Sequence, residues 1–327
     1  MGIQQKIASK IVPHLWFDHE AAEAAEFYAS VFPNSSVDNV TPIPAETPSG
    51  PAGSVDVAEF TVFGQPFMAI SAGPLFRINP SISFMVNFDP LFFGAAETRD
   101  QEARNKIDEV WEKLSDGGKA LMPLDKYPFS ERYGWIEDRF GVSWQLILTN
   151  AEGEPRPPII PALLFTQHNA GKAEEAINFY VSVFRNARIG SLHRYPGGMA
   201  PEQEGTIMFA DFVLENQWFA AMDSVAEHKF VFNEAVSLMV MCENQREIDY
   251  YWEKLSAEPQ AEQCGWLKDR FGVSWQISPR VLGEMMKHTE QARARSATEA
   301  MLEMKKFDIA ALEEAFNAPS SPSTSDR

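Results

Sequence analysis

Cysteine is nearly absent from this sequence, which has Cys242 and Cys264 as its only two thiols in 327 residues. Two cysteines exclude a disulfide framework and a metal cluster built from cysteine alone. Long apolar runs are also missing, because no stretch approaches the ~20 apolar residues needed to cross a bilayer. The segment MGIQQKIASKIVP has no apolar core like that of a signal peptide. We therefore expect reduced thiols and a cytoplasmic location.

Basic residues are scarce relative to acidic ones. The 28 Lys and Arg residues face 46 Asp and Glu residues, for a formal net charge of −18. No basic stripe interrupts this excess, which argues against nucleic acid and membrane as partners. The apolar share of 45% and the charged share of 23% are typical of folded globular chains. A length of 327 residues suits two domains, each large enough for its own core.

The sequence contains an internal duplication, which has to be identified before any fold is assigned. GWIEDRFGVSWQL, starting at Gly134, returns as GWLKDRFGVSWQI at Gly265, and IDEVWEKLS at Ile107 returns as IDYYWEKLS at Ile248. Three further matches keep the same order: VPHLWF at 12–17 with IPALLF at 160–165, FYASVFPN at 27–34 with FYVSVFRN at 179–186, and FTVFGQPFMAI at 60–70 with FVLENQWFAAM at 212–222.

The duplication predicts the domain limits. TNAEGEPRPP at 149–158 is polar and rich in proline, as exposed junctions are. After about residue 280 the sequence has strong helix formers and no counterpart in the first half, which indicates a helical tail. We predict a first domain at 1–148, a linker at 149–157, a second domain with its tail at 158–316, and a disordered end at 317–327.

Periodicity predicts the same order of elements in each copy. In the second copy an apolar strand precedes an amphipathic helix with Asn169 placed as its cap, and two strands then flank a turn at Glu215 and Asn216. A strand, a helix and a final strand GVSWQI follow. This order predicts an α+β fold with curved mixed sheets, each with helices on one face and a concave cup on the other.

The motifs FYxSVF, IDxxWEKL and CGWLKDRFGVSWQI, with the tail AMLEMKKFDIAALEEAF, resemble the PhnB-like family. That family is often catalogued as 3-demethylubiquinone-9 3-methyltransferase domains and lies within the vicinal oxygen chelate (glyoxalase/bleomycin-resistance) superfamily. The resemblance covers nearly all of residues 11–316 and is specific for a family, not for a reaction. It implies two tandem domains, each built of two βαβββ units.

The resemblance also implies where a metal would bind. Metalloenzymes of the superfamily carry a histidine on the first strand, a ligand on the strand opening the second unit, and a glutamate on the last strand. The matching positions are His14, Ser81 and Gln145 in the first copy, and Ala162, Ala235 and Gln276 in the second. Glutamine is a weak, neutral ligand for a divalent ion. We therefore expect no resident metal or cofactor; the alternative is a divalent ion that recruits His14 with Glu59, or with Asp56 or Asp211.

Strand alternation selects the side chains that face the cup. In GVSWQL, Trp144 and its alternate neighbours would pack under the helices, which leaves Ser143 and Gln145 on the open face. The predicted ligand-binding residues are His14, Trp16, Ser81, Ser83, Gln145, Leu164 and Gln276. Such a lining suits a small, partly apolar ligand. The alternative is that these side chains fill the cup as core and that His14 makes one structural hydrogen bond.

Two further positions have structural interpretations. Cys264 stands where the first copy has Tyr133, and no histidine is near it in sequence to activate a thiolate. Asp138 and Asp269 fall in turns, where a carboxylate accepts hydrogen bonds from nearby backbone amides.

Three functions remain open at this stage. The leading hypothesis is a PhnB-like protein that binds a small organic molecule in one or both cups, with no reaction specified and enzyme status undecided. The second is a metal-dependent lyase, isomerase or dioxygenase of the superfamily. A methyltransferase is disfavoured, because the sequence has no glycine-rich strand-to-helix loop followed by an acidic residue. The expected partners are a small-molecule ligand and the other copy within the same chain, with a monomer or weak homodimer as the assembly.

Overall fold

The computed structural model describes residues 9–150 and 154–318. The first copy contributes two units of a strand, a helix and three strands. The first unit is β1 (Ile11–Phe17), α1 (Ala21–Val31), β2 (Ser36–Pro42), β3 (Asp56–Val62) and β4 (Gln65–Ser71). The second is β5 (Ile82–Phe88), a 3₁₀ turn (Pro90–Phe92), α2 (Arg99–Ser115), β6 (Lys119–Tyr127), β7 (Ser130–Glu137) and β8 (Ser143–Leu148).

The second copy contributes two more units and a tail. The third unit is β9 (Ile159–Phe165), a 3₁₀ turn (Gln167–Asn169), α3 (Ala173–Val183), β10 (Arg188–Arg194), β11 (Ile207–Leu214) and β12 (Gln217–Asp223). The fourth is β13 (Val236–Cys242), α4 (Gln245–Leu255), a 3₁₀ turn (Pro259–Ala261), β14 (Trp266–Lys268) and β15 (Ser274–Pro279). The tail is α5 (Arg280–Met286), α6 (Gln291–Leu302) and α7 (Ile309–Asn317).

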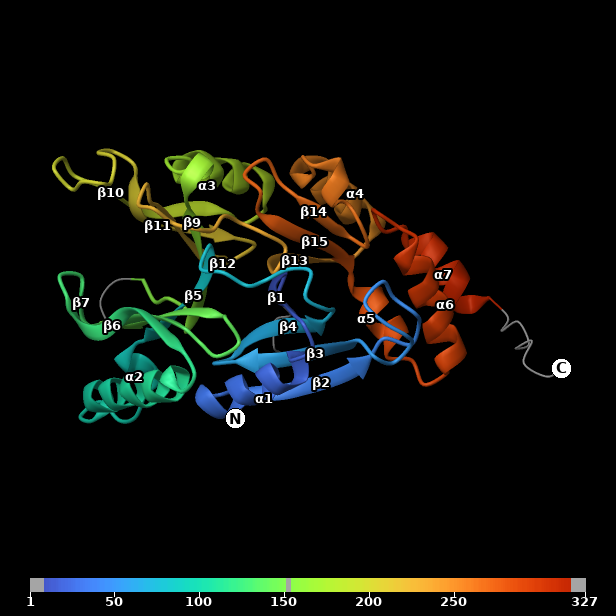
Figure 1. The fold of residues 1–327 in the computed structure, drawn as a ribbon, viewed down its shortest axis with the longest axis horizontal. Coiled ribbons are helices and arrows are strands. Elements are labelled where there is room, and N and C mark those ends of the chain that lie inside the picture. Colours follow the sequence, from blue (N-terminus) through green and yellow to red (C-terminus); the bar gives the residue numbers. More distant parts are fainter. Residues whose placement is uncertain (1–8, 151–153, 319–327) are drawn as a thin grey trace.

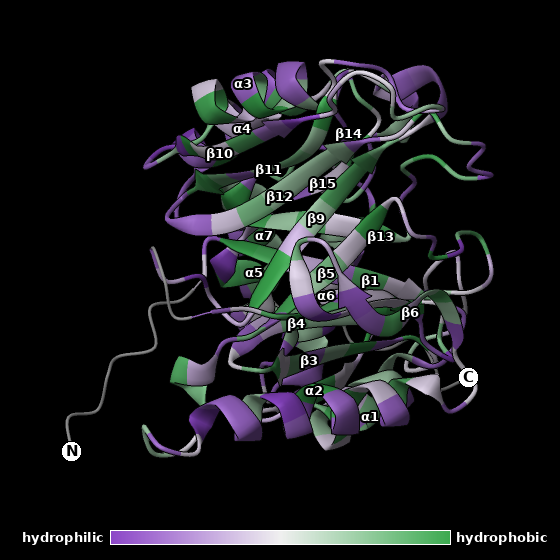
Figure 2. Cartoon of the chain, turned by 90° about the vertical axis from the view of Figure 1, so that its left-hand side faces the viewer, coloured by the Kyte–Doolittle hydropathy of each residue, from purple (hydrophilic) through white to green (hydrophobic). Residues whose placement is uncertain are grey.

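The α+β fold and the helical tail are confirmed. Figure 1 shows α3 and α4 along the top of the molecule, α1 and α2 along the bottom, and the strands between these two layers. In Figure 2 the helices α1 and α3 carry both hydrophilic and hydrophobic residues, and the strands between them are largely hydrophobic. The tail packs on the main core through Leu312, with Met301, Met304, Ile309 and Phe316 partly buried. Within the described residues, no helix is long and apolar enough to span a membrane. The disordered end expected at 317–327 falls mostly on residues 319–327, which lie outside the described part.

Each sheet takes strands from both copies of the duplication. The seven-stranded sheet has the order β14-β15-β13-β1-β4-β3-β2, and the eight-stranded sheet has the order β10-β11-β12-β9-β5-β8-β7-β6. The copies meet where the first strands of units pair antiparallel, β1 with β13 (Ile11 opposite Val240) and β5 with β9 (Ile82 opposite Leu163). The first unit therefore shares a sheet with the fourth, and the second with the third.

The fourth unit is shorter than the others. Its helix is followed by the two strands β14 and β15, where each other unit has three. The sequence accounts for this: Leu114 and Gly134 are 20 positions apart, whereas their counterparts Leu255 and Gly265 are 10 positions apart. The deletion removes the residues that would match β6, and it leaves β14 at the edge of the seven-stranded sheet.

Local signals in the sequence gave one correct turn and one incorrect cap. Glu215 and Asn216 have φ values of 50° and 63° and join β11 to β12, as predicted. Asn169 does not cap α3, because its Nδ2 donates to the Phe271 carbonyl at 2.7 Å. The first turn of α3 is instead capped by Asp223, the last residue of β12, whose Oδ1 accepts from the backbone N of Gly171 and Ala173.

A buried aspartate clamps the last hairpin of each copy to the helices, as the turn positions predicted. Asp269 Oδ1 accepts from the backbone N of Phe271 and Val273, and its Oδ2 accepts from Trp275 Nε1 at 2.9 Å and Tyr180 Oη at 2.7 Å. Asp138 makes the equivalent bonds to two backbone amides and to a tryptophan indole. Burial raises the pKa of both carboxyl groups to about 6, against the hydrogen bonds that lower it.

Replacing Asp269 with asparagine tests this clamp. Because the pKa of folded Asp269, about 6, exceeds its ordinary value of 3.8, folded Asp269 retains a proton between these pH values that the unfolded chain releases. The contribution of Asp269 to the free energy of unfolding is therefore largest below pH 4 and falls as the pH rises to about 6. At ~1.4 kcal/mol per pH unit, the stability difference between wild type and Asp269→Asn should narrow by at most about 3 kcal/mol from pH 4 to pH 7. Urea unfolding across this range measures it; a difference that widens with pH would contradict the raised pKa.

Candidate functional site

The face of each sheet turned away from the helices carries the predicted ligand-binding residues. On β1, Leu15 and Phe17 belong to the main core with α1, whereas His14 and Trp16 point the other way. On β8, Trp144 lies against Tyr28 and Phe32 of the α1 region. We name the two helix-free faces the seven-stranded cup and the eight-stranded cup.

The predicted residues group by sheet and not by copy. His14, Trp16 and Gln276 lie in the seven-stranded cup, which joins the first unit to the fourth. The eight-stranded cup holds Ser81, Ser83, Gln145 and Leu164. The two units of the first copy lie in different sheets, because each pairs with a unit of the second copy. The three superfamily positions of the first copy are therefore divided between the sheets, with His14 in one and Ser81 and Gln145 in the other.

A row of polar side chains forms the floor of the seven-stranded cup. His14 is opposite Ser237 on β13, and Ser274 lies beside Ser237 on β15. His14 is 4% exposed and Ser274 is 0% exposed, yet neither His14 Nδ1 nor Ser274 Oγ has a hydrogen-bond partner among the described residues. Burial lowers the pKa of His14 to about 3, so the ring is neutral at physiological pH. Buried polar atoms without partners are rare, because each costs about 1–3 kcal/mol.

Gln276 adds a third polar atom above this floor. Its Nε2 donates to Ser237 Oγ at 2.9 Å. Within the described residues, no group donates to its Oε1. The neutral His14, the Ser274 hydroxyl and the Gln276 carbonyl could thus accept from and donate to one bound molecule.

Aromatic rings form the wall of the same cup. Trp266 lies edge-on to the His14 ring, with ring centroids 5.5 Å apart, and to Trp16 at 6.0 Å. Trp16 is in turn edge-on to Phe76 at 5.0 Å, and its Nε1 donates to the Gly73 carbonyl. These partly exposed rings give the site an apolar side above its polar floor.

The eight-stranded cup satisfies the corresponding polar atoms internally. Gln145 Oε1 accepts from Tyr133 Oη and its Nε2 donates to Ser83 Oγ, both at 2.7 Å. Ser143, the counterpart of Ser274, accepts from Trp135 Nε1 at 2.7 Å. Gln145 thus has protein partners at both ends of its amide.

One substitution separates the two cups. Cys264 stands where the eight-stranded cup has Tyr133, so the hydroxyl that would reach Gln276 Oε1 is missing. Burial raises the pKa of the Cys264 thiol, which argues against a reactive thiolate there. The contrast between Tyr133 and Cys264 is visible in the sequence, but its consequence follows only once Gln145 and Tyr133 are placed on neighbouring strands.

The floor of the eight-stranded cup is filled by its own apolar side chains. They form a small cluster separate from the main core: Met85, Ile160, Ala162, Val213, Trp218 and Ala220, with Ile147, Phe209 and Met222 partly buried beside them. None of the predicted ligand-binding residues belongs to this cluster.

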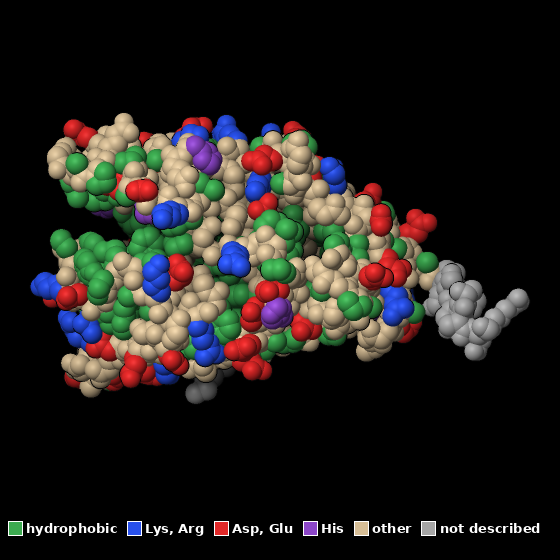
Figure 3. Space-filling model, viewed as in Figure 1, with side chains coloured by type: hydrophobic (Ala, Val, Ile, Leu, Met, Phe, Trp, Pro, Cys, Tyr) green, Lys and Arg blue, Asp and Glu red, His purple; other side chains and the backbone are tan. Residues whose placement is uncertain are grey.

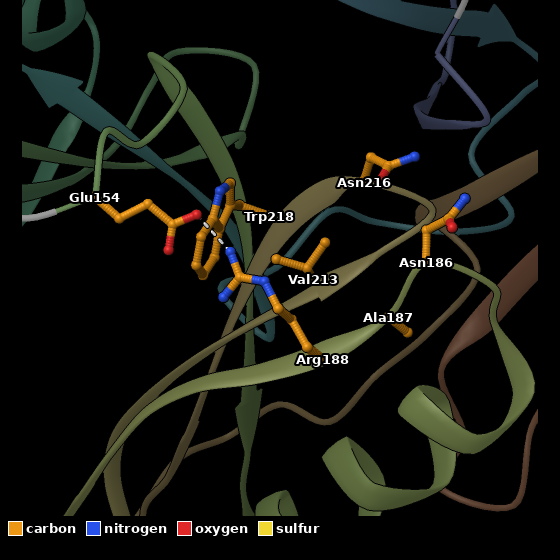
Figure 4. Close-up of a pocket in the computed structure, with 7 residues that line it drawn as sticks. All are labelled: Glu154, Asn186, Ala187, Arg188, Val213, Asn216 and Trp218. Carbon is orange, nitrogen blue, oxygen red and sulfur yellow. Dashed lines mark hydrogen bonds and ion pairs between the residues drawn. The ribbon is translucent and has the colours of Figure 1, made fainter.

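A pocket of about 480 Å³ opens at the edge of the eight-stranded sheet. Figure 4 shows Arg188 and Glu154 pointing toward one another across it, beside Trp218. Arg156 lies 3.6 Å and Arg188 4.6 Å from the Trp218 ring centre, and Arg156 is paired with Asp211. Since its charges are already paired within the protein, this pocket offers little to a ligand beyond the indole.

The residues of the seven-stranded cup do not fit a divalent metal ion. Glu59, the metal candidate besides His14, lies on the same row of the sheet beyond Met68, but its carboxylate is bound by Lys287 Nζ at 2.6 Å. Asp211, at the equivalent place in the other cup, is bound by Arg156. Within residues 9–150 and 154–318, no three His, Cys, Asp or Glu side chains converge to hold an ion.

The comparisons with known proteins agree with this fold. A family profile described as 3-demethylubiquinone-9 3-methyltransferase matches residues 9–147 and again 157–278. No curated protein matches the chain. The PhnB protein from Bacillus cereus is 35% identical over 43% of this chain and 100% of its own, with a TM-score of 0.35. Glyoxalase I from Zea mays is 10% identical over 86% of this chain and 98% of its own, with a TM-score of 0.51, which is a likeness of fold alone.

Alanine at the two equivalent serines should have opposite effects. Ser274→Ala removes a buried hydroxyl that has no partner, so the free energy of unfolding should stay equal or rise. Ser143→Ala leaves the Trp135 indole without its acceptor, so the free energy of unfolding should fall by about 1 kcal/mol. Urea unfolding of both variants measures the difference. A larger loss for Ser274→Ala than for Ser143→Ala would show that Ser274 is paired.

Replacing His14 with phenylalanine tests its buried, neutral state. Because the pKa of folded His14, about 3, lies below its ordinary value of 6.5, the unfolded chain takes up a proton between these pH values that folded His14 does not. The contribution of His14 to the free energy of unfolding is fully present above pH 6.5. It is lost on acidification, by at most about 5 kcal/mol at pH 3. Urea unfolding from pH 7.5 to pH 4.5 should therefore show a steeper loss for wild type than for His14→Phe. Equal slopes would refute the shift.

Proposed function

We propose, given that this chain belongs to the 3-demethylubiquinone-9 3-methyltransferase family, that it binds a small, partly apolar organic molecule in the seven-stranded cup. The observation that carries the proposal is the pair of buried, unpartnered polar atoms, His14 Nδ1 and Ser274 Oγ, on the floor of that cup. A bound ligand that hydrogen-bonds to them would offset the cost of their burial.

The lining suggests the chemistry of the ligand. Its polar floor has a neutral histidine, a hydroxyl and an amide carbonyl, so the matching group is uncharged and has both a donor and an acceptor, such as an amide or a phenol. Trp16 and Trp266 supply ring faces and edges for a planar apolar portion. An anionic ligand is disfavoured, because His14 stays neutral. Among the described residues that form the floor, no cationic side chain would balance the negative charge of such a ligand.

A methyl transfer, which the family's description names, has little support in this chain. The sequence has no glycine-rich strand-to-helix loop of the kind that binds adenosyl cofactors in doubly wound folds. The metal-dependent reactions of the superfamily are disfavoured by the Lys287 contact to Glu59 and by the two glutamines.

The experiment is a ligand-observed saturation-transfer NMR screen of uncharged aromatic amides and phenols, with 4-hydroxybenzamide as the reference probe. We expect binding to wild type, and a roughly 3- to 10-fold weaker affinity for Ser274→Ala and for His14→Phe, because each loses one hydrogen bond. Ser143→Ala, the matched variant in the eight-stranded cup, should bind like wild type. A panel with no binder, or binders affected by Ser143→Ala and by neither of the other variants, would overturn the proposal.

A further inference from the structure

We infer that the tail, residues 280–318, is a movable cover over the seven-stranded cup, held closed by the ion pair between Lys287 and Glu59, and that its release admits molecules to His14. The inference rests on the proposed function for what enters the cup. The tail contacts strands near both edges of the seven-stranded sheet.

At one end of the sheet, the tail is anchored to β14. The backbone N of Cys264 donates to the Met304 carbonyl at 2.8 Å, and that of Gly265 donates to the Lys305 carbonyl at 2.7 Å. Phe307 is 3% exposed and packs so close to Gly265 that a Cβ there would lie 2.5 Å from its ring. The tail thus takes the place beside β14 that β6 takes beside β7, where the fourth unit lacks ten residues.

At the other end, the tail reaches the first unit by polar contacts. Lys287 Nζ donates to Glu59, which lies on the cup face of β3 two strands from His14. Arg295 Nε of α6 donates to the Pro44 carbonyl in the loop between β2 and β3 at 3.0 Å. Because β14 and β3 lie near opposite edges of the seven-stranded sheet, a segment that contacts both must cross the cup.

The eight-stranded cup shows the same architecture without a cover. In Figure 3 a hollow lined with hydrophobic side chains opens on the left-hand side, between the lower layer near β6 and β7 and the upper layer near β10 and β11 of Figure 1. On the right-hand side, where α5, α6 and α7 lie in Figure 1, no matching hollow opens. The covered cup is also the one whose polar floor lacks protein partners.

The strengths of the contacts indicate which part moves. The anchor at β14 combines backbone hydrogen bonds with the buried Phe307 and Leu312. The contacts to the first unit include an ion pair whose side chains are 41% and 29% exposed, a class that contributes little to stability. The residues that α6 buries fully are small, namely Ala294, Ala297 and Thr298. The segment 287–302 can therefore lift from β3 while the anchor holds.

The experiment measures access to His14 directly. Diethyl pyrocarbonate, a small neutral reagent, acylates neutral imidazole nitrogens, and peptide mass spectrometry assigns the modified histidine. Lys287→Glu should raise the rate at His14 by roughly 2- to 10-fold, since it replaces attraction to Glu59 with repulsion. The exchanged pair Lys287→Glu with Glu59→Lys should restore the wild-type rate. His19, an exposed histidine on the same chain, should react equally in all variants.

Lys126→Glu is the matched control, because it breaks an exposed ion pair with Glu131 that lies away from the tail. These variants keep the full chain, since deletion of the tail would expose Phe307 and Leu312 and could unfold the fourth unit. An unchanged rate at His14 in Lys287→Glu, or an equal rise in Lys126→Glu, would overturn the cover. A rise in the rate at His14 that the exchanged pair reverses supports the cover. If this rise is seen but no amide or phenol binds, the proposed ligand site is refuted and the cover stands.

Discussion

Antiparallel pairing between the first strands of the units is the constraint on which the rest of the structure depends. A unit whose first strand stood at an edge would leave a row of backbone groups without partners. Here β1 pairs with β13 and β5 pairs with β9, so every unit joins its sheet to a unit of the other copy. Each cup therefore has one half from each copy, and a change within one unit alters one half of one cup and leaves the other cup as it was.

This arrangement lets the two cups diverge within one chain. The eight-stranded cup has Ala162 at the position equivalent to His14, and its polar network is closed through Tyr133, Gln145 and Ser83. The seven-stranded cup has His14, and Cys264 stands at the position from which a tyrosine would reach Gln276. In both cups, a basic residue binds the carboxylate that was a metal-ligand candidate: Arg156 binds Asp211, and Lys287 binds Glu59. Each basic residue comes from the segment that follows the last strand of a copy. Each of these two carboxylates is therefore paired with a cation of its own chain.

Much of the fold could be predicted from the sequence because its signals are local. The repeated motifs fixed the copies, alternation placed Trp144 in the core and Gln145 in the cup, and the turn position of Asp269 indicated its bonds to Phe271 and Val273. The pairing of the first unit with the fourth, and of the second with the third, could not be predicted from local signals. It depends on which strand edges are free after each unit folds. The same holds for Lys287 and Glu59, which are 228 positions apart and meet only when the tail crosses the cup.

The pairing of β1 with β13 also bears on the order in which the chain can fold. Val86 and Ile159 of the eight-stranded sheet are 73 positions apart, whereas Ile11 and Val240 of the seven-stranded sheet are 229 positions apart. During synthesis the eight-stranded sheet can close first, while β1 keeps an unpaired edge until β13 (Val236–Cys242) has been made. Long-range pairings of this kind are slow and leave strand edges exposed to aggregation. The ribosome-bound chain therefore exposes the edge of β1 for longer than that of β5, and the tail emerges only after β15 has completed the cup.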